Sequence, residues 1–362
     1  MTRVQICIAL LLTAVSAPAV FAQTAAEIDA RASQVASSRA PKTDSTRPGV
    51  ANPDANSYPS ASKERKPTAV ESAQNSFRAG VASLDARQYK DAITSLEAAR
   101  RLAPNSVNVH TALGYAYFCL DEYENSIKAY ERAVSLGSSS GATQRALGAA
   151  YLKLGKPEQA IPPLQEATRL EPENAINHYL LGVAYNDAGQ LDEAVDQFLR
   201  SIGLDSNNSL SYFALASVYH EQSRTQDAIG FLKEAIRLKP DFGDAYLALA
   251  YVLSSSGNFA EAIPNYNSAI RLNPQSSLAR NNIGVTYMGM GKNKEALAAF
   301  KCAATLDPNS GTIHLNLARA YLRLRNKDAA LAEHTVLKTI DSELGKALYD
   351  EIFQARILKV HD

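Results

Sequence analysis

The stretch GATQRALGAAYLKLGKPEQAIPPLQEATRLEPEN, residues 141–174, shows a pattern that recurs along most of the chain. A 34-residue ruler placed at Ala73 and stepped eight times without a gap ends at Leu344. Position 8 of every step is glycine or alanine, as at Gly148, and position 20 is always alanine or serine. Position 27 is also small in seven of the eight steps. Repetition at this period predicts a stack of similar supersecondary units.

Each 34-residue step contains two helical segments. Apolar residues at a 3.6-residue spacing predict a first helix over positions 1–14 and a second over about 18–31. Glycine near position 15, as at Gly155, breaks the chain between them, and proline at position 32, as at Pro172, ends the second helix. Small residues at positions 8, 20 and 27 let the helices approach closely, and larger ones at positions 11 and 24 fill the space beside them. The sequence therefore predicts an all-α chain of antiparallel helix pairs.

These residues and their spacing resemble the tetratricopeptide repeat family. The resemblance covers residues 73–344, three quarters of the chain. It implies an α-solenoid, a right-handed superhelix of eight 34-residue helix-turn-helix repeats. Repeat 8 departs from the pattern, because His334 and Leu337 occupy positions where other core residue types are expected.

One further helix is expected after the repeats. Residues 345–362 are predicted to form a capping helix and tail, with the helix running over about 344–359. Its apolar stripe consists of Leu344, Leu348, Ile352 and Ala355. A solenoid needs a solvating cap of this kind at its open end.

The chain begins with the pattern of a targeting segment. Arg3 precedes an apolar run over residues 4–15, and Ala22 ends a cleavage site of small residues. Residues 1–22 are therefore predicted to be a signal peptide, and the protein to be exported, periplasmic or secreted. The alternative is an uncleaved membrane anchor, but the apolar run is short for a span, which needs about 17–25 residues. No later segment is apolar enough to span a membrane, so no membrane insertion is expected after cleavage.

Residues 23–72 have the composition of a linker. They are rich in alanine, serine, proline and charge, and Tyr58 is their only aromatic residue. A stretch that buries so little apolar surface cannot offset its chain entropy, which predicts disorder. The segment is either a spacer or a tail that docks on a partner, and its sequence leaves both open.

No motif of enzymatic chemistry occurs in the sequence. It contains no Gly-rich phosphate loop, no HExxH, no CxxC and no nucleophile elbow. Only 18 residues remain after the repeats, so no separate catalytic domain fits, and neither catalysis nor a cofactor is expected. Basic and acidic residues both number 37, and this neutrality argues against nucleic acid or an anionic membrane as the main partner.

The histidines and cysteines do not form a predicted site. His110, His178 and His314 all fall at position 4 of their repeats. Side chains two repeats apart would be separated by about 16–20 Å, too far to share a metal ion. We therefore expect them to pack at this position and predict no metal site. Cys119 and Cys302 lie five repeats apart, which excludes a disulfide between them, and both are expected to be small core residues.

The family resemblance also implies where a partner would bind. In that family, positions 2, 5, 9, 12 and 13 of the first helix commonly face the concave groove. Carried onto this chain, the candidate partner-binding residues of the concave face are Phe77, Tyr115, Phe118, Arg145, Tyr179, Phe213, Tyr251, Asn281 and Arg319. Aromatic side chains bury a large area at low rotamer cost, which suits binding. The alternative is that individual residues of this set are partly buried between neighbouring first helices.

The expected function is protein–protein interaction outside the cytoplasm, with an extended or helical partner segment in the groove. Position 5 lacks the lysine of the family's carboxylate clamp, so binding of chaperone tails is not expected. A second hypothesis is a scaffold of envelope assembly or polysaccharide export, in which a glycan is the ligand, since aromatic residues also suit sugars. A third is an enzyme that bears repeats, such as a glycosyl transferase, for which the catalytic domain is missing.

Overall fold

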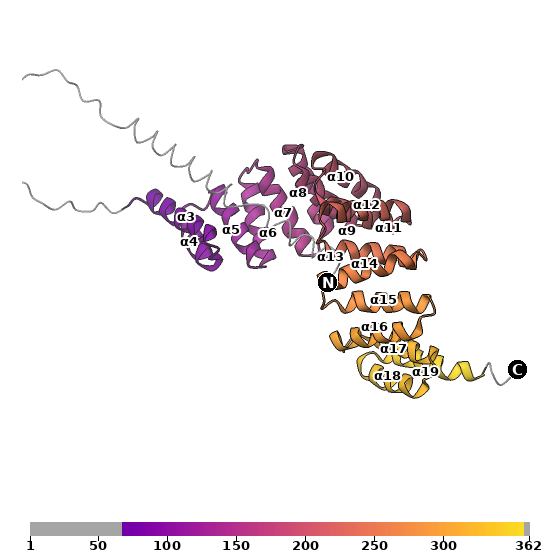
Figure 1. The fold of residues 1–362 in the computed structure, drawn as a ribbon. Helices are drawn as coiled ribbons and strands as arrows, with labels where there is room; N and C mark the ends of the chain where they lie inside the picture. The colour runs from indigo at the N-terminus through magenta and orange to yellow at the C-terminus, as the bar shows by residue number, and fades with distance from the viewer. Residues whose placement is uncertain (1–66, 358–362) are drawn as a thin grey trace, which may run out of the picture. The chain divides into compact units, whose positions relative to one another are not determined.

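The computed structural model describes residues 67–357, and all regular structure within that range is helical. The predicted signal peptide and the predicted linker up to residue 66 lie outside the described residues. The helices form two compact units that divide between Ala188 and Gly189. The first unit contains α3 (Ala69–Asp85), α4 (Tyr89–Leu102), α5 (Val107–Cys119), α6 (Tyr123–Ser135), α7 (Gly141–Lys153), α8 (Pro157–Leu170) and α9 (Ala175–Asp187) (Figure 1).

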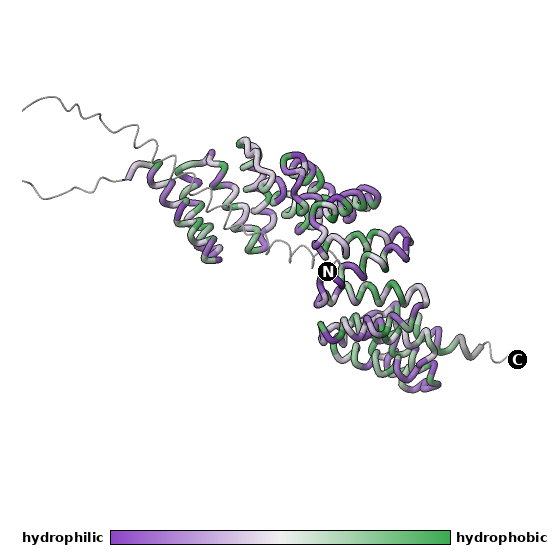
Figure 2. The backbone as a smooth tube through the Cα atoms, turned by 45° about the horizontal axis from the view of Figure 1, so that its top comes forward, coloured by the Kyte–Doolittle hydropathy of each residue, from purple (hydrophilic) through white to green (hydrophobic). Residues whose placement is uncertain are grey.

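The second unit continues the same alternation of helices. It contains α10 (Leu191–Leu204), α11 (Ser209–Glu221), α12 (Thr225–Leu238), α13 (Gly243–Ser255), α14 (Phe259–Leu272), α15 (Ser277–Gly289), α16 (Asn293–Leu306), α17 (Gly311–Arg323), α18 (Lys327–Ile340) and α19 (Ser342–Ile357). Hydrophobic and hydrophilic residues are interspersed along these helices (Figure 2), and in second helices such as α12 the buried residues Ala228, Leu232 and Ala235 recur on one side. The predicted all-α fold of paired helices is confirmed.

The first helix begins earlier than the repeat pattern indicated. Helix α3 starts at Ala69, four residues before the start of the ruler at Ala73. Thr68 caps it, because its side-chain oxygen accepts a hydrogen bond from the Glu71 amide while the Glu71 carboxylate accepts one from the Thr68 amide. This capping box satisfies two amides that the helix itself cannot, so residues 69–72 are helical rather than part of a linker.

Close approach of the two helices in a repeat explains the small residues at position 8. A Cβ atom added at Gly80 would lie 2.6 Å from Leu96 Cγ, and one added at Gly284 would lie 2.7 Å from Phe300 Cε1. Carbon atoms in contact normally stay about 3.5–4.0 Å apart, so a methyl group does not fit at either place. The predicted close approach of the two helices at position 8 is confirmed at these residues, and the structure shows that the side chain at position 24 lies directly against it.

The turn between the two helices of a repeat has one geometry. Position 15 is left-handed, with glycine at Gly155, Gly189, Gly257 and Gly291 (φ 72–81°). The remaining four turns place a non-glycine residue there, namely Arg87, Asp121, Ser223 and Arg325 (φ 58–62°). In the turns inside each unit the amide of the next residue bonds back to position 11, as Lys156 N–H does to the Tyr151 carbonyl at 3.0 Å. This is the Schellman arrangement that ends many helices.

The C-terminal helix caps the second unit. Helix α19 contacts α17 and α18 and buries Leu348 and Ile352 against them. Helix α18 forms despite the altered pattern of repeat 8, and Leu337 is fully buried within it. None of the described helices is both long and apolar enough to cross a bilayer.

Candidate functional site

The first helices of consecutive repeats lie side by side within each unit. In the first unit α3 contacts α5, α5 contacts α7 and α7 contacts α9. In the second unit α13 contacts α15 and α15 contacts α17. The second helix of a repeat contacts the first helix of the next repeat, as α14 contacts α15. We call the side of each unit that is formed by these neighbouring first helices its inner face.

An exposed apolar surface occupies the inner face of the second unit on α13 and α15. Tyr251 is 39% exposed, Leu278 53% and Val285 42%. Leu278 and Val285 are seven residues apart, about two helical turns, so they lie on the same side of α15. We call these three residues the α13–α15 surface. Neighbouring helices therefore present three large apolar side chains to solvent in one region.

Polar side chains tie the first helices around this surface to one another. The hydroxyls of Ser254 and Thr286 lie 2.8 Å apart and join α13 to α15. The Arg323 guanidinium donates to the Met288 carbonyl at 2.9 Å and joins α17 to α15. Arg319 forms an ion pair with Glu351 of α19. These contacts fix the spacing of the helices that carry the α13–α15 surface.

Two charged groups of the second unit's first helices have altered acidity. Burial raises the pKa of the Asp244 carboxyl, and Lys239 partly opposes that rise. The hydrogen bond from Arg319 to Glu351 raises the pKa of the Arg319 guanidinium. Asp244 lies in the first turn of α13 and Arg319 lies on α17, so the two helices next to α15 carry an acidic and a basic group.

The predicted residues of the first unit are largely engaged in contacts of the fold. Arg145 donates 2.9–3.0 Å hydrogen bonds to Glu171 and Asn177, and its side chain is only 12% exposed. Phe118 packs edge-on against Tyr123 with ring centroids 5.4 Å apart. Tyr115 is half-buried, and burial is the main cause that raises the pKa of its hydroxyl.

Three of the predicted partner-binding residues offer almost no surface. Phe77 is 6% exposed, Tyr179 0% and Asn281 7%. Phe77 belongs to the core around α3–α5, and Asn281 accepts a 2.9 Å hydrogen bond from Asn316 on α17. For these three the alternative interpretation, burial within the fold, describes the structure. The position of a residue in the repeat predicts which side of the helix its side chain is on. It does not predict whether large side chains of neighbouring helices cover that side chain.

Three other predicted residues keep some exposed surface in the second unit. Tyr251 is exposed and packs edge-on against His220 at 5.6 Å between ring centroids. Phe213 is half-buried, with its ring 5.0 Å from that of Phe242. The side chain of Arg319 is 41% exposed. Sequence reasoning missed Leu278 and Val285, although positions 2 and 9 identified them, because it selected aromatic and polar residues.

Models of the tetratricopeptide repeat match most of the described residues. One tetratricopeptide repeat model matches residues 77–141 and 145–209, and others match 211–246, 252–291 and 287–334. The chain belongs to the tetratricopeptide repeat family. No curated protein matches the sequence significantly.

Solved structures share the fold of this tetratricopeptide repeat protein. PilF of Pseudomonas aeruginosa is 23% identical, with a TM-score of 0.52 over 60% of this chain and 97% of that one. A tetratricopeptide repeat protein of Parabacteroides merdae is 15% identical, with a TM-score of 0.54 over 68% and 98%. A chain of the APC/C hetero-tetramer Cut9–Hcn1 is 16% identical, with a TM-score of 0.54 over 73% of this chain and 52% of that one. At these identities the similarity shows the fold alone.

The histidines at position 4 connect consecutive repeats of this tetratricopeptide repeat protein. His110, His178 and His314 each place Nε2 2.8–2.9 Å from the carbonyl oxygen of the proline six residues earlier. The ring nitrogen donates a hydrogen bond to that carbonyl, so histidine at position 4 satisfies a backbone acceptor at the end of the preceding repeat. Among the described residues no group of three metal-ligating side chains converges.

The two cysteines of the repeats are free, and one of them differs from expectation. Cys119 is half-buried, and burial raises the pKa of its thiol. Cys302 is exposed on α16, so the prediction that it is a core residue is wrong. Position 26, which it occupies, faces solvent on the second helix.

The family and the fold together give the general class of activity. Tetratricopeptide repeat domains bind proteins or peptides, and proteins of this family are generally non-catalytic scaffolds. The described structure adds to this a specific exposed apolar region on α13 and α15.

Proposed function

We propose that the protein is an exported scaffold that binds an extended or helical segment of a partner protein on its inner face. The observation that supports this most directly is the α13–α15 surface, where Tyr251, Leu278 and Val285 are each more than a third exposed. Exposed apolar side chains gathered in one place mark interaction sites more often than isolated ones do.

The arrangement of the surface suits a partner segment with apolar anchors. Tyr251 supplies a rigid aromatic side chain, and residues of this type carry much of the energy of protein interfaces. Leu278 and Val285 extend the apolar area along α15 over about two turns, roughly 10 Å. A helix with apolar residues at i, i+3 and i+7, or an extended strand of similar length, would cover this area.

Export is proposed from the sequence of residues 1–22, which has the basic start, apolar run and small-residue site of a signal peptide. The partner would then be a periplasmic, secreted or envelope protein. N-terminal sequencing of the protein recovered from outside the cytoplasm should begin at Gln23. A protein that keeps Met1 would instead be anchored or cytoplasmic and would contradict this part of the proposal.

Site-specific photocrosslinking in the native compartment tests the binding face. A crosslinker in place of Val285 on α15 should capture a partner, whereas one in place of Ala298, exposed on the second helix of the same repeat, should not. Equal capture of the same protein from both positions would show that the inner face is not the binding site. Capture of no protein together with binding of a purified glycan would favour the polysaccharide hypothesis.

The captured partner then allows a quantitative test with purified proteins. Tyr251→Ala should weaken binding by about 1–2 kcal/mol, which is typical of an aromatic anchor at an interface. Thr305→Ala, on the solvent side of α16, is the matched control and should leave the affinity unchanged. Tyr251 is partly exposed but also packs against His220, so its replacement should leave the circular dichroism unaltered and lower the thermal stability only slightly, and the affinities are compared well below the unfolding temperature.

A further inference from the structure

The side chain at position 23 of a repeat can lie over the first helix of the same repeat. In repeat 5, Phe231 occupies this position, with its ring 6.1 Å from that of Tyr212 at position 4 and 5.4 Å from that of Tyr219 at position 11. In repeat 8, Glu333 occupies the same position and its carboxylate lies 2.7 Å from His314 Nδ1, again at position 4. Two repeats thus show that this space can be entered by the residue at position 23.

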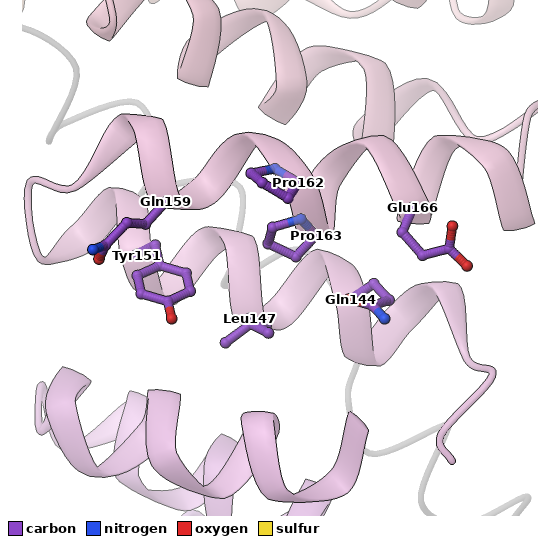
Figure 3. Close-up of a pocket in the computed structure, with 7 residues that line it drawn as sticks. All are labelled: Gln144, Leu147, Tyr151, Gln159, Pro162, Pro163 and Glu166. Carbon is purple, nitrogen blue, oxygen red and sulfur yellow. The ribbon is translucent and has the colours of Figure 1, made fainter. Parts of the chain in front are cut away.

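Repeat 3 leaves the corresponding space open. Its position 23 is Pro163, whose short ring cannot reach across to α7 as Phe231 reaches across to α11. A shallow pocket of about 500 Å³, broadly open to solvent, lies there between α7 and α8. Figure 3 shows its lining, which consists of Gln144, Leu147, Tyr151, Gln159, Pro162, Pro163 and Glu166.

The walls of this α7–α8 pocket suit an aromatic side chain. Leu147, the Tyr151 ring and the two prolines are apolar, and Tyr151 is the counterpart of Tyr219, on which Phe231 packs in repeat 5. The Tyr151 hydroxyl donates a 2.5 Å hydrogen bond to Glu131, which holds the ring in place. Aromatic pairs gain about 0.5–1.5 kcal/mol beyond the area that they bury.

The pocket also offers hydrogen-bond acceptors. Gln144, Gln159 and Glu166 line it, and their side-chain oxygens can accept a hydrogen bond. The Glu166 carboxylate at the rim is already paired with Arg169 at 2.7 Å. An aromatic side chain that carries a hydroxyl donor, as tyrosine does, therefore matches this lining better than phenylalanine.

The α7–α8 pocket is separate from the inner face. At about 100° per residue, positions 4, 7 and 11 of a first helix lie about half a turn from positions 2, 5, 9 and 12, which carry the inner-face residues. A ligand of the pocket would thus leave the inner face open, and this inference does not depend on the proposed partner site.

We propose that Tyr58 of the same chain docks in the α7–α8 pocket. Tyr58 is the one aromatic residue between Gln23 and Lys66, and it lies nine residues before Pro67, where the described structure begins. Nine extended residues span up to about 30 Å. Helix α3 contacts α5 and α5 contacts α7, two steps that add up to about 20 Å between helix axes, so the tether is long enough.

Attachment to the same chain favours this occupant over a free peptide. A short flexible tether gives its ligand an effective concentration in the millimolar range, so a total binding free energy of about 4 kcal/mol, from the buried ring and its neighbouring residues together, is enough for half occupancy. The docked segment would lie against the repeats on the side away from the inner face. Residues 59–66 would then be held along the first three repeats.

The absence of tryptophan from the chain provides a clean experiment. Tyr58→Trp in the full chain introduces a single tryptophan, whose fluorescence and quenching by acrylamide report whether the side chain is covered. Adding Pro163→Phe should fill the pocket as Phe231 does in repeat 5 and expel the introduced indole. Quenching should then rise by a factor of about 2 or more, given the strength of an aromatic contact.

Pro163→Ala is the matched control, because it changes the same residue but leaves the pocket open. Quenching of the introduced tryptophan should stay low in that variant, and circular dichroism should confirm that both variants are folded. Equal quenching in the parent and in both variants would overturn the proposal. A protected tryptophan that becomes exposed on dilution would also overturn it, because the occupant would then be a second copy of the chain.

Discussion

The close approach of α5 and α6 predicts that a single added methyl group destabilises the fold. A Cβ atom at Gly114 would lie 2.8 Å from both Cδ1 and Cε1 of Tyr130 and 2.9 Å from its Cγ. The ring would have to move by at least about 0.7 Å to restore an ordinary carbon contact of about 3.5 Å. Tyr130 is 2% exposed and packs with Ile127 and Leu147, so the displaced ring has no free space to enter.

The expected magnitude for Gly114→Ala combines two opposing effects. Overpacking of a filled core costs about 1–3 kcal/mol, while alanine favours the helix over glycine by about 1 kcal/mol. Gly230→Ala is the matched control, because Gly230 is exposed on α12 and an added Cβ meets no atom within 4 Å. The control should gain the helix preference alone, so the two variants should differ in unfolding free energy by about 1–3 kcal/mol.

Urea unfolding of the purified chain, followed by circular dichroism, measures this difference. Hydrogen exchange of the α5 and α6 amides localises it, which matters because repeat proteins open in parts. Repeats 5 and 6 carry alanine at position 8 together with Leu232 and Tyr266 at position 24, so the expected loss comes from how closely the Tyr130 ring is placed against Gly114 and not from the residue types alone. If Gly114→Ala stabilises the chain as much as Gly230→Ala does, the explanation of the small residues at position 8 is wrong.

Three further changes test other contacts. Glu171→Ala should lower the unfolding free energy by about 2 kcal/mol, because it removes a charged hydrogen-bond partner from the nearly buried Arg145. Leu348→Ala should lower it by about 2–5 kcal/mol by opening a cavity beneath α19, and should speed hydrogen exchange in α17 and α18. Burial raises the pKa of Tyr266 to about 12, so stability that is fully present below about pH 10 should decline as the pH rises towards 12, and less so in Tyr266→Phe. Thermal unfolding at a series of pH values, together with tyrosinate absorbance, measures the last effect.

Two of these changes have a matched control in the chain. Glu166→Ala breaks an exposed ion pair with Arg169 and should leave unfolding unchanged, in contrast to Glu171→Ala. Tyr349→Ala removes an exposed side chain of α19 and should have a much smaller effect than Leu348→Ala. A Tyr349→Ala variant that loses as much stability as Leu348→Ala would show that the cap is not held by its buried stripe.

Packing within a repeat could be predicted from sequence because it recurs. The glycines at position 8 face large residues at position 24 in repeat after repeat, so the pattern itself encodes the contact. The start of α3 was missed because Thr68 and Glu71 lie before the first full repeat, where only the capping box indicates a helix. The repeat pattern predicts the contacts that all repeats share, but it does not predict where the first helix begins.

Features of single repeats were harder to predict. Tyr179 and Tyr251 occupy comparable inner-face positions, yet one is fully buried and the other 39% exposed. Their exposure depends on which side chains the neighbouring helices contribute, and that differs between repeats. The α7–α8 pocket likewise depends on the particular side chains of one repeat, where Pro163 leaves open a space that Phe231 fills in repeat 5, and it becomes visible only when the repeats are compared in three dimensions.

The left-handed residue at position 15 has a consequence for how the chain resists unfolding. Four turns hold an arginine, aspartate or serine in a conformation that costs a side-chain-bearing residue about 1 kcal/mol or more, and those turns belong to repeats 1, 2, 5 and 8. Hairpins built this way should loosen first, giving proteases and denaturants their earliest access. Conversely, Arg87→Gly or Arg325→Gly would relieve this conformational cost and stabilise the first or the last repeat. Neither change would alter a side chain of the α13–α15 surface or of the α7–α8 pocket.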